Sequence, residues 1–238
     1  MRSTGRKSIR SLAGFIFAIL LVSPASAQVL RLHILAATGT VQEVQEALKA
    51  GANFNDSDWT GVTALMAAAS TNHDPNVVQV LLRSGAIVDA RDGNGQTALM
   101  FAAERNADPA VITALVGGGA AVESKDRLGR TPLIYAAKCS PVVSVVTALL
   151  GAGANVNARD SYGMTALLYA AWVGQNTAVA SALLQAGANP NARSTEGRGL
   201  MEYAENNPVF VKDPTAMQQL QDAIKNSRAS AERSQLHG

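Results

Sequence analysis

Four nine-residue segments of nearly the same sequence recur along this chain at a constant interval of 34 residues. They read GVTALMAAA (61–69), GQTALMFAA (95–103), GRTPLIYAA (129–137) and GMTALLYAA (163–171). A second block keeps the interval, with GAIVDARD (85–92), GAAVESKD (119–126), GANVNARD (153–160) and GANPNARS (187–194). Such a period is typical of arrays in which each unit buries its apolar surface against its neighbours.

The residues inside each copy predict two short helices separated by a turn. Threonine is a residue that caps the start of a helix, and it recurs at Thr63, Thr97, Thr131 and Thr165. Glycine ends helices in the left-handed conformation, as expected at Gly85, Gly119, Gly153 and Gly187. Each copy then closes on an Asp-x-x-Gly turn, such as the one from Asp126 to Gly129.

This combination resembles the ankyrin repeat family. The family pattern is roughly D-x-x-G-x-T-P-L-H-x-A-A, a second helix, and then G-A-D-V-N-A, and residues 130–133 and 153–160 follow it closely. His33 matches the histidine of the pattern in a first, shorter copy, and later copies replace it with Met66, Met100, Ile134 and Leu168. The tetratricopeptide family shares the period but not this content.

The resemblance implies an all-α solenoid of five to six ankyrin repeats in which helix pairs alternate with β-hairpin fingers. We place the repeats in residues 28–205, at about 28–57, 58–91, 92–125, 126–159 and 160–193, with a partial copy at 194–207. A capping helix is expected within 208–226, because Met217, Leu220 and Ile224 share one apolar face. The small and charged residues 227–238 are expected to form a disordered tail.

The first 27 residues have the pattern of a secretory signal peptide. Four basic residues precede an apolar run from Leu12 to Val22, and Ala25-Ser26-Ala27 provides a cleavage site. A membrane-spanning helix needs about 20 apolar residues, roughly twice the length of this run. We therefore expect export across a bacterial-type inner membrane, cleavage after Ala27, and a mature chain in the periplasm or outside the cell.

Cleavage changes the charge of the chain. The full sequence has 20 Lys and Arg against 18 Asp and Glu, and losing the four basic residues of the signal leaves a formal charge of −2. The alkaline isoelectric point of the full sequence is thus no argument for binding to nucleic acid or anionic lipid. We expect no nucleic acid partner, no membrane contact after cleavage, and a monomer.

No grouping of residues indicates catalysis, a cofactor or a metal. His33, His73 and His237 form no cluster with metal-ligand spacing, and the glycines at 117–119 end a helix rather than bind phosphate. The single Cys139 has no partner for an internal disulfide and no base to activate it as a nucleophile. We expect a non-enzymatic protein with an inert thiol at Cys139.

Two ladders share the period of the repeat. Basic residues precede the turn acid at Arg91, Lys125, Arg159 and Arg193; they could recruit an acidic partner, but the aspartates that recur in step favour ion pairs within the array. Aromatic rings recur at Phe101, Tyr135, Tyr169 and Tyr203, where half-buried packing is favoured over a binding role.

Other positions vary between copies, and the family resemblance places them on a concave face. The candidate partner-binding residues there are Trp59, Arg105, Arg127, Leu128, Arg130, Tyr162, Met164 and Trp172. Aromatic residues, methionine and arginine are enriched as anchors of protein interfaces. We expect Arg127, Leu128 and Arg130 to lie beside Tyr162, Met164 and Trp172, which would form an apolar patch with basic edges.

The resulting hypothesis is a non-catalytic module that binds another protein, of unknown identity, through the concave face. Three alternatives remain open. One is an immunity or inhibitor protein that neutralises a toxin, which predicts a single tight partner. Another is a secreted effector directed at a host. The third is a stress-related enzyme that uses Cys139, which predicts a low thiol pKa and loss of activity on Cys139→Ser.

The signal peptide makes a direct prediction about the mature chain. Mass spectrometry of the exported protein should find its N-terminus at Gln28, because the site after Ala27 is the one that signal peptidases cleave. A mature form that still carries Leu12 to Val22 contradicts the assignment.

Overall fold

The computed structural model of the chain describes residues 24–106 and 108–236. Residues 1–23 of the predicted signal peptide lie outside the described range. Helices and loops account for the described chain, and its one strand-like pairing is an isolated bridge between Ser57 and Thr63. The all-α fold class is confirmed. The expected β-hairpin fingers are instead loops without strands, and these five fingers span 50–63, 84–97, 118–131, 152–165 and 186–199.

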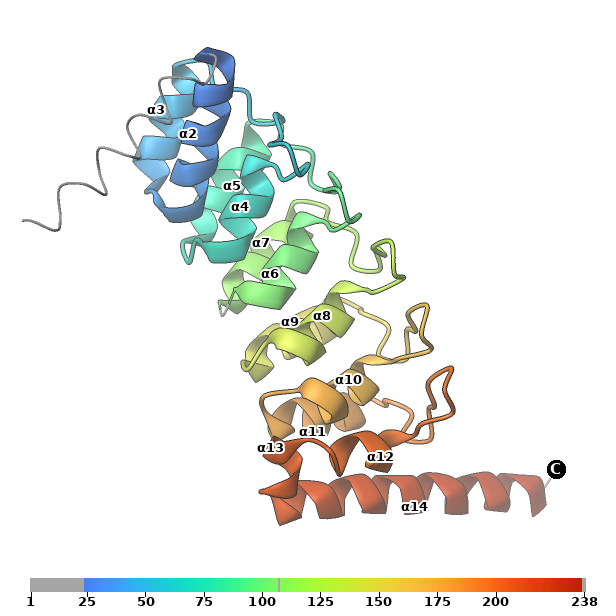
Figure 1. Cartoon of the computed structure of the whole chain (residues 1–238). Coiled ribbons are helices and arrows are strands. Elements are labelled where there is room, and N and C mark those ends of the chain that lie inside the picture. The colour runs from blue at the N-terminus through green and yellow to red at the C-terminus, as the bar shows by residue number, and fades with distance from the viewer. Residues whose placement is uncertain (1–23, 107, 237–238) are drawn as a thin grey trace, which may run out of the picture.

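The helices stack in two rows beside the fingers (Figure 1). The inner row consists of α2 (Pro24–Thr38), α4 (Ala64–Thr71), α6 (Ala98–Arg105), α8 (Pro132–Cys139), α10 (Ala166–Val173) and α12 (Leu200–Ala204). The outer row consists of α3 (Val41–Lys49), α5 (Pro75–Arg83), α7 (Pro109–Gly117), α9 (Val143–Gly151) and α11 (Thr177–Gln185). Each helix packs against the next helix of its own row, so the array is continuous.

Local sequence fixes where these helices begin and end. The hydroxyls of Thr63, Thr131 and Thr165 accept the backbone N–H three residues ahead, which satisfies a donor at the start of α4, α8 and α10. Gly85, Gly119, Gly153 and Gly187 follow the ends of the outer helices with φ values between 86° and 99°. Thr97 also precedes a helix, α6, but its hydroxyl makes no cap hydrogen bond. The glycine stops are therefore confirmed, and the threonine caps are confirmed at three of the four predicted positions.

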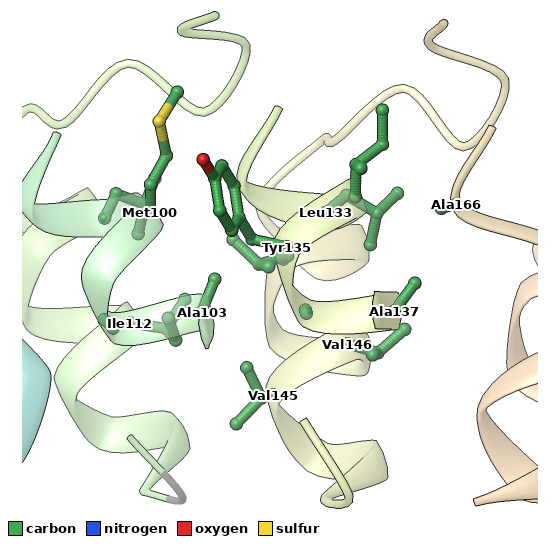
Figure 2. Packing of buried hydrophobic residues seen from close by; sticks show 14 of the residues in the cluster. Met100, Ala103, Ile112, Leu133, Tyr135, Ala137, Val145, Val146 and Ala166 are labelled. Atoms are coloured by element: carbon green, nitrogen blue, oxygen red, sulfur yellow. The ribbon is translucent and has the colours of Figure 1, made fainter. Parts of the chain in front are cut away.

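The core lies between successive inner helices and is built from small and branched side chains. Leu65, Leu99, Leu133 and Leu167 are no more than 1% exposed. Figure 2 shows Tyr135 on the side of its helix that faces Met100 of the preceding repeat, while Leu133 and Ala137 lie on the side that faces Ala166 of the following repeat. Alanine at the closest approaches allows the helices to pack tightly, so each repeat depends on its neighbours for burial.

Asparagine side chains connect the repeats at the far end of the inner helices. The Asn72 amide donates to the carbonyls of Ala36 and Gly39, and the Asn106 amide donates to those of Ala69 and Asn72. Asn207 bonds to the carbonyls of Ala171 and Gly174. Each amide thus satisfies carbonyls of the preceding repeat that helix geometry leaves without a partner. The sequence pattern gave no indication of this role.

The fingers are joined to one another by hydrogen bonds between backbone groups and by hydrogen bonds between side chains and the backbone. Ser161 N–H donates to Leu128 O at 2.9 Å, and Thr195 N–H donates to Tyr162 O at 2.9 Å. The predicted ion pairs of the basic ladder are wrong for Arg91 and Arg159: these guanidinium groups bond to backbone carbonyls of the next repeat, Lys125 O at 2.6 Å and Arg193 O at 3.0 Å. The neighbouring aspartates are occupied by the finger's own donors.

The C-terminal end of the array closes with α13 (Pro208–Val211) and α14 (Pro214–Leu236). Helix α14 packs against α11 and so takes the outer-row place of a sixth repeat; it crosses the end of the stack in Figure 1. The prediction of a disordered tail from residue 227 is wrong for residues 227–236, because α14 continues through them instead of ending at 226. None of the helices in the described ranges is long and apolar enough to cross a membrane.

The packing predicts very different effects for a core residue and a finger residue. Leu133→Ala should lower the free energy of unfolding by about 2–5 kcal/mol, because it opens a cavity between α6, α8 and α10. Arg159→Ala should cost less than about 1.5 kcal/mol, the usual net value of one hydrogen bond. Denaturant titration measures both, and equal losses contradict this division between core and fingers.

Candidate functional site

An aspartate at the start of each of the first four turns holds the finger in shape. In the fourth finger, Asp160 Oδ1 accepts the backbone N–H groups of Tyr162 and Met164, both at 2.9 Å. Gly163 between them has φ 68°, and a Cβ there would lie 3.1 Å from the backbone nitrogen of Thr195. The turn therefore requires both the carboxylate and the glycine, and it directs the Tyr162 side chain outward.

The other carboxylate oxygen connects the finger to the inner row. Asp126 Oδ2 accepts the Tyr135 hydroxyl at 2.7 Å, and Asp160 Oδ2 accepts the Tyr169 hydroxyl at 2.7 Å. Arg130 completes the first of these groups, with Nε 2.8 Å and Nη2 2.7 Å from Asp126 Oδ2. Because Tyr135 and Tyr169 are 2% and 5% exposed, the aromatic ladder is packing at these positions.

These contacts shift the acidities of the groups involved. Burial alone would raise the pKa of Asp126, but hydrogen bonds from Tyr135 and Arg130 outweigh it and lower this pKa. Burial, together with the hydrogen bond to the carboxylate, raises the pKa of Tyr135 and of Tyr169. The carboxylate and the neutral phenol are therefore the stable forms across the physiological pH range.

A hollow of about 470 Å³ opens between the fourth and fifth fingers and the ends of α8, α10 and α12. Tyr162 and Trp172 border it, and they are 53% and 46% exposed. The Trp172 ring lies 6.1 Å from the Tyr169 ring and 5.8 Å from the Tyr203 ring, within the range of favourable aromatic contacts. Its full lining is Lys138, Tyr162, Met164, Tyr169, Trp172, Val173, Ser194, Thr195, Glu196, Arg198 and Tyr203.

The structure thus brings Tyr162, Met164 and Trp172 together, as the sequence predicted. The expectation that Met164 is an exposed anchor is wrong, because it is 3% exposed and belongs to the core beneath the hollow. Methionine is flexible enough to fill an irregular space of this kind. Tyr162 and Trp172 remain as the accessible pair.

The expected neighbours from the preceding repeat do not line the hollow. Arg127 and Leu128 lie on the third finger, with Leu128 38% exposed, and the Arg130 side chain is 17% exposed and engaged by Asp126. Two more candidates lie in other repeats. Trp59 is 96% exposed on the first finger, and Arg105 lies over the Phe101 ring at 5.6 Å. The predicted basic edge is therefore provided by other residues.

The residues that sequence reasoning missed come from the following, partial repeat. Glu196 and Arg198 occupy the finger positions equivalent to Tyr162 and Met164, and Tyr203 is equivalent to Tyr169. The sequence analysis assigned Tyr203 to the aromatic ladder as packing, and comparing the variable finger positions in one further copy would have found Glu196 and Arg198. Lys138 and Arg198 supply the positive charge of the hollow, and Glu196 supplies the negative charge.

Cys139 has none of the features of a catalytic thiol. It is partly buried at the end of α8, and burial, followed by the nearby Glu104, raises the pKa of its thiol. A raised pKa disfavours the thiolate, which is the reactive form. Within the described residues, no three His, Cys, Asp or Glu side chains lie close enough to hold a metal ion.

The lowered pKa of Asp126 predicts a specific dependence of stability on pH. In the unfolded chain an aspartate carboxyl has a pKa of about 3.9. The stabilisation from Asp126 is therefore complete above that pH, and it is lost as the pH falls through the lower pKa of the folded state. The unfolding free energy of the wild type should therefore fall more steeply below pH 4 than that of Asp126→Asn.

Denaturant titrations at several pH values check this expectation. Tyr135→Phe is the matched variant, since it keeps the carboxylate and removes one donor; its loss of stability on acidification should be smaller than that of the wild type and should be complete at a higher pH, because the folded pKa lies closer to the unfolded one. Parallel curves for the wild type and Asp126→Asn would show that the carboxylate is not held in its charged form.

Comparison with known proteins agrees with the geometry. The family profile described as "Ankyrin repeats (3 copies)" matches residues 32–126 and 99–194, which together exceed half of the chain. A comparison with the curated proteins finds no match. Ankyrin repeats generally mediate binding to other proteins and are typically non-catalytic. With its paired helices, fingers and 34-residue register, the chain belongs to the ankyrin repeat family.

Proposed function

We propose that this protein is a non-catalytic module that binds another protein through the face formed by the fingers and the inner helices. The centre of the binding surface is the hollow bordered by Tyr162 and Trp172. The observation that carries this proposal is the exposure of both rings at one place, where neither is required by the repeat. The equivalent finger residues in other repeats are Thr60, Asn94 and Leu128.

The composition of the hollow supports a protein ligand. Aromatic side chains line it together with the charged side chains of Lys138, Glu196 and Arg198. Protein interfaces combine apolar side chains at the centre with polar side chains at the rim. Tyrosine and tryptophan contribute large contact areas for a small loss of conformational entropy, so exposed rings of these types are suited to anchoring a partner.

We further propose that the protein acts as a monomer in the periplasm or outside the cell. The support is the basic, apolar and small-residue succession at the N-terminus. Export removes the chain from the cytoplasm, so its partner is sought in the periplasm or in the surrounding medium.

The proposal predicts that the aromatic pair carries much of the affinity. Tyr162→Ala combined with Trp172→Ala should weaken partner binding by more than about 2 kcal/mol, roughly 30-fold, as interface anchors do. The partner is first isolated by affinity capture with the chain from Gln28 onward, from periplasmic extract and from culture medium. Titration calorimetry then measures the affinity, and melting curves report on folding.

Two control variants separate binding from folding. Ile87→Ala with Val211→Ala removes two apolar side chains of similar exposure, 59% and 58%, that do not line the hollow. Arg91→Ala with Lys125→Ala tests the finger ladder. Both should bind nearly as well as the wild type. Normal binding by the aromatic double variant, or its unfolding, contradicts the proposed site.

A further inference from the structure

The turn aspartates bind backbone donors in the same way in four successive fingers. Oδ1 of Asp58, Asp92, Asp126 and Asp160 accepts the N–H groups two and four residues ahead, over distances of 2.7–3.1 Å. The third finger adds the Tyr135 hydroxyl and the Arg130 guanidinium at Oδ2. Together these donors form a complete binding site for one carboxylate.

The fifth finger repeats the donors but not the carboxylate. Ser194 occupies the aspartate position, and Glu196 N–H, Arg198 N–H, the Arg198 guanidinium and the Tyr203 hydroxyl follow at the same spacings as in the third finger. Nothing in the described part of the chain accepts a hydrogen bond from these two backbone N–H groups or from the Tyr203 hydroxyl. The fifth finger therefore has the hydrogen-bond donors of a carboxylate site but lacks the carboxylate that would accept from them.

Ser194 does not substitute for the carboxylate. The residue is 8% exposed, and its Oγ is buried with no hydrogen-bond partner among the described residues. A buried hydroxyl without a partner is costly; among the described side chains, Thr97 Oγ1 is in the same situation, but it does not line the hollow. Arg130 pairs with the turn aspartate of its own finger, but Arg198 has no such carboxylate to bind. It pairs instead with Glu196 at 3.2 Å, and both of these side chains are at least 60% exposed.

All of these groups border the hollow that contains the exposed aromatic pair. Ser194, Glu196, Arg198 and Tyr203 line it together with Tyr162 and Trp172. The lining has two basic side chains and one acidic side chain, which favours an anionic group. An acceptor that enters from the solvent can therefore reach the donors that the chain leaves without one.

We propose that this hollow binds a side-chain carboxylate of the partner protein in the place of the missing turn aspartate. The carboxylate would accept hydrogen bonds from Arg198, Tyr203 and the two backbone N–H groups, while Tyr162 and Trp172 contact an adjacent apolar residue. An Asp or Glu side chain is favoured because the chain itself fills the equivalent sites with aspartate side chains. This inference rests on the proposed function, since it defines what part of the partner is recognised.

The test uses a capped dipeptide, N-acetyl-Glu-Phe-amide, titrated into the ¹⁵N-labelled chain from Gln28 onward. The amide proton signals of Glu196 and Arg198 should move downfield in a saturable manner, because they gain a charged acceptor. The neutral probe N-acetyl-Gln-Phe-amide and the terminal carboxylate of N-acetyl-Gln-Phe should each bind at least about tenfold more weakly. Equal binding of the neutral probe, or no shift of either signal, overturns the proposal; equal binding of the terminal carboxylate overturns the assignment to a side chain.

Variants extend the test to the site itself. Ser194→Asp restores the internal carboxylate, so it should raise the melting temperature and abolish probe binding. Arg198→Met introduces the residue found at the same position in the preceding repeat, Met164, and should weaken probe binding at least about tenfold. Arg127→Met removes the same charge from the third finger, away from the hollow, and should have no effect. Unchanged binding by Ser194→Asp overturns the proposal.

The captured partner separates this inference from the proposed function. If Ser194→Asp binds the partner normally and the Tyr162→Ala, Trp172→Ala variant does not, the protein-binding site stands and the carboxylate site is wrong. If both variants bind normally, both proposals are wrong. Loss of partner binding by both variants, with Ser194→Asp folded and stabilised, is the expected result.

Discussion

The turn carboxylate of the third and fourth fingers is the contact on which the geometry of the inner face depends. One oxygen of Asp126 or Asp160 fixes the turn, and the other fixes a tyrosine of the inner helix. These two fingers are therefore held against the inner helices of their own repeats. Hydrogen bonds between neighbouring fingers add to this link but do not connect the fingers to the helix row.

The same contact explains how one array combines rigidity with variety. Its donors are backbone N–H groups, which every finger has, so the residues between the aspartate and the threonine are free to change, except for the turn glycine. Tyr162 and Leu128 occupy the same turn position with different side chains, and the turn is unaltered. Binding residues can thus be exchanged at these positions at little cost to the fold.

Much of this architecture could be predicted because the repeat supplies its own alignment. Thr165, Leu167 and Gly153 have the roles expected from their equivalents in other copies, and Tyr162 and Trp172 stand out where those equivalents differ. Prediction was weaker where the register ends. Residues 227–236 read as a tail, but they contain no helix breaker and many helix-forming residues, so α14 continues. Met164 was misjudged because the equivalent residues Val62, Gln96 and Arg130 are partly exposed, so the pattern did not indicate that this copy buries its side chain.

The position of the hollow has a consequence for how such a chain can change over evolution. It is formed by the last full repeat and the partial one, and α14 closes the stack directly behind them. Because repeats interact chiefly with their nearest neighbours, duplication or loss of an internal unit such as 92–125 would lengthen or shorten the array without rebuilding the hollow. If the hollow is the binding site that we propose, the N-terminal repeats would act as a spacer of adjustable length, and recognition would stay at the C-terminal end.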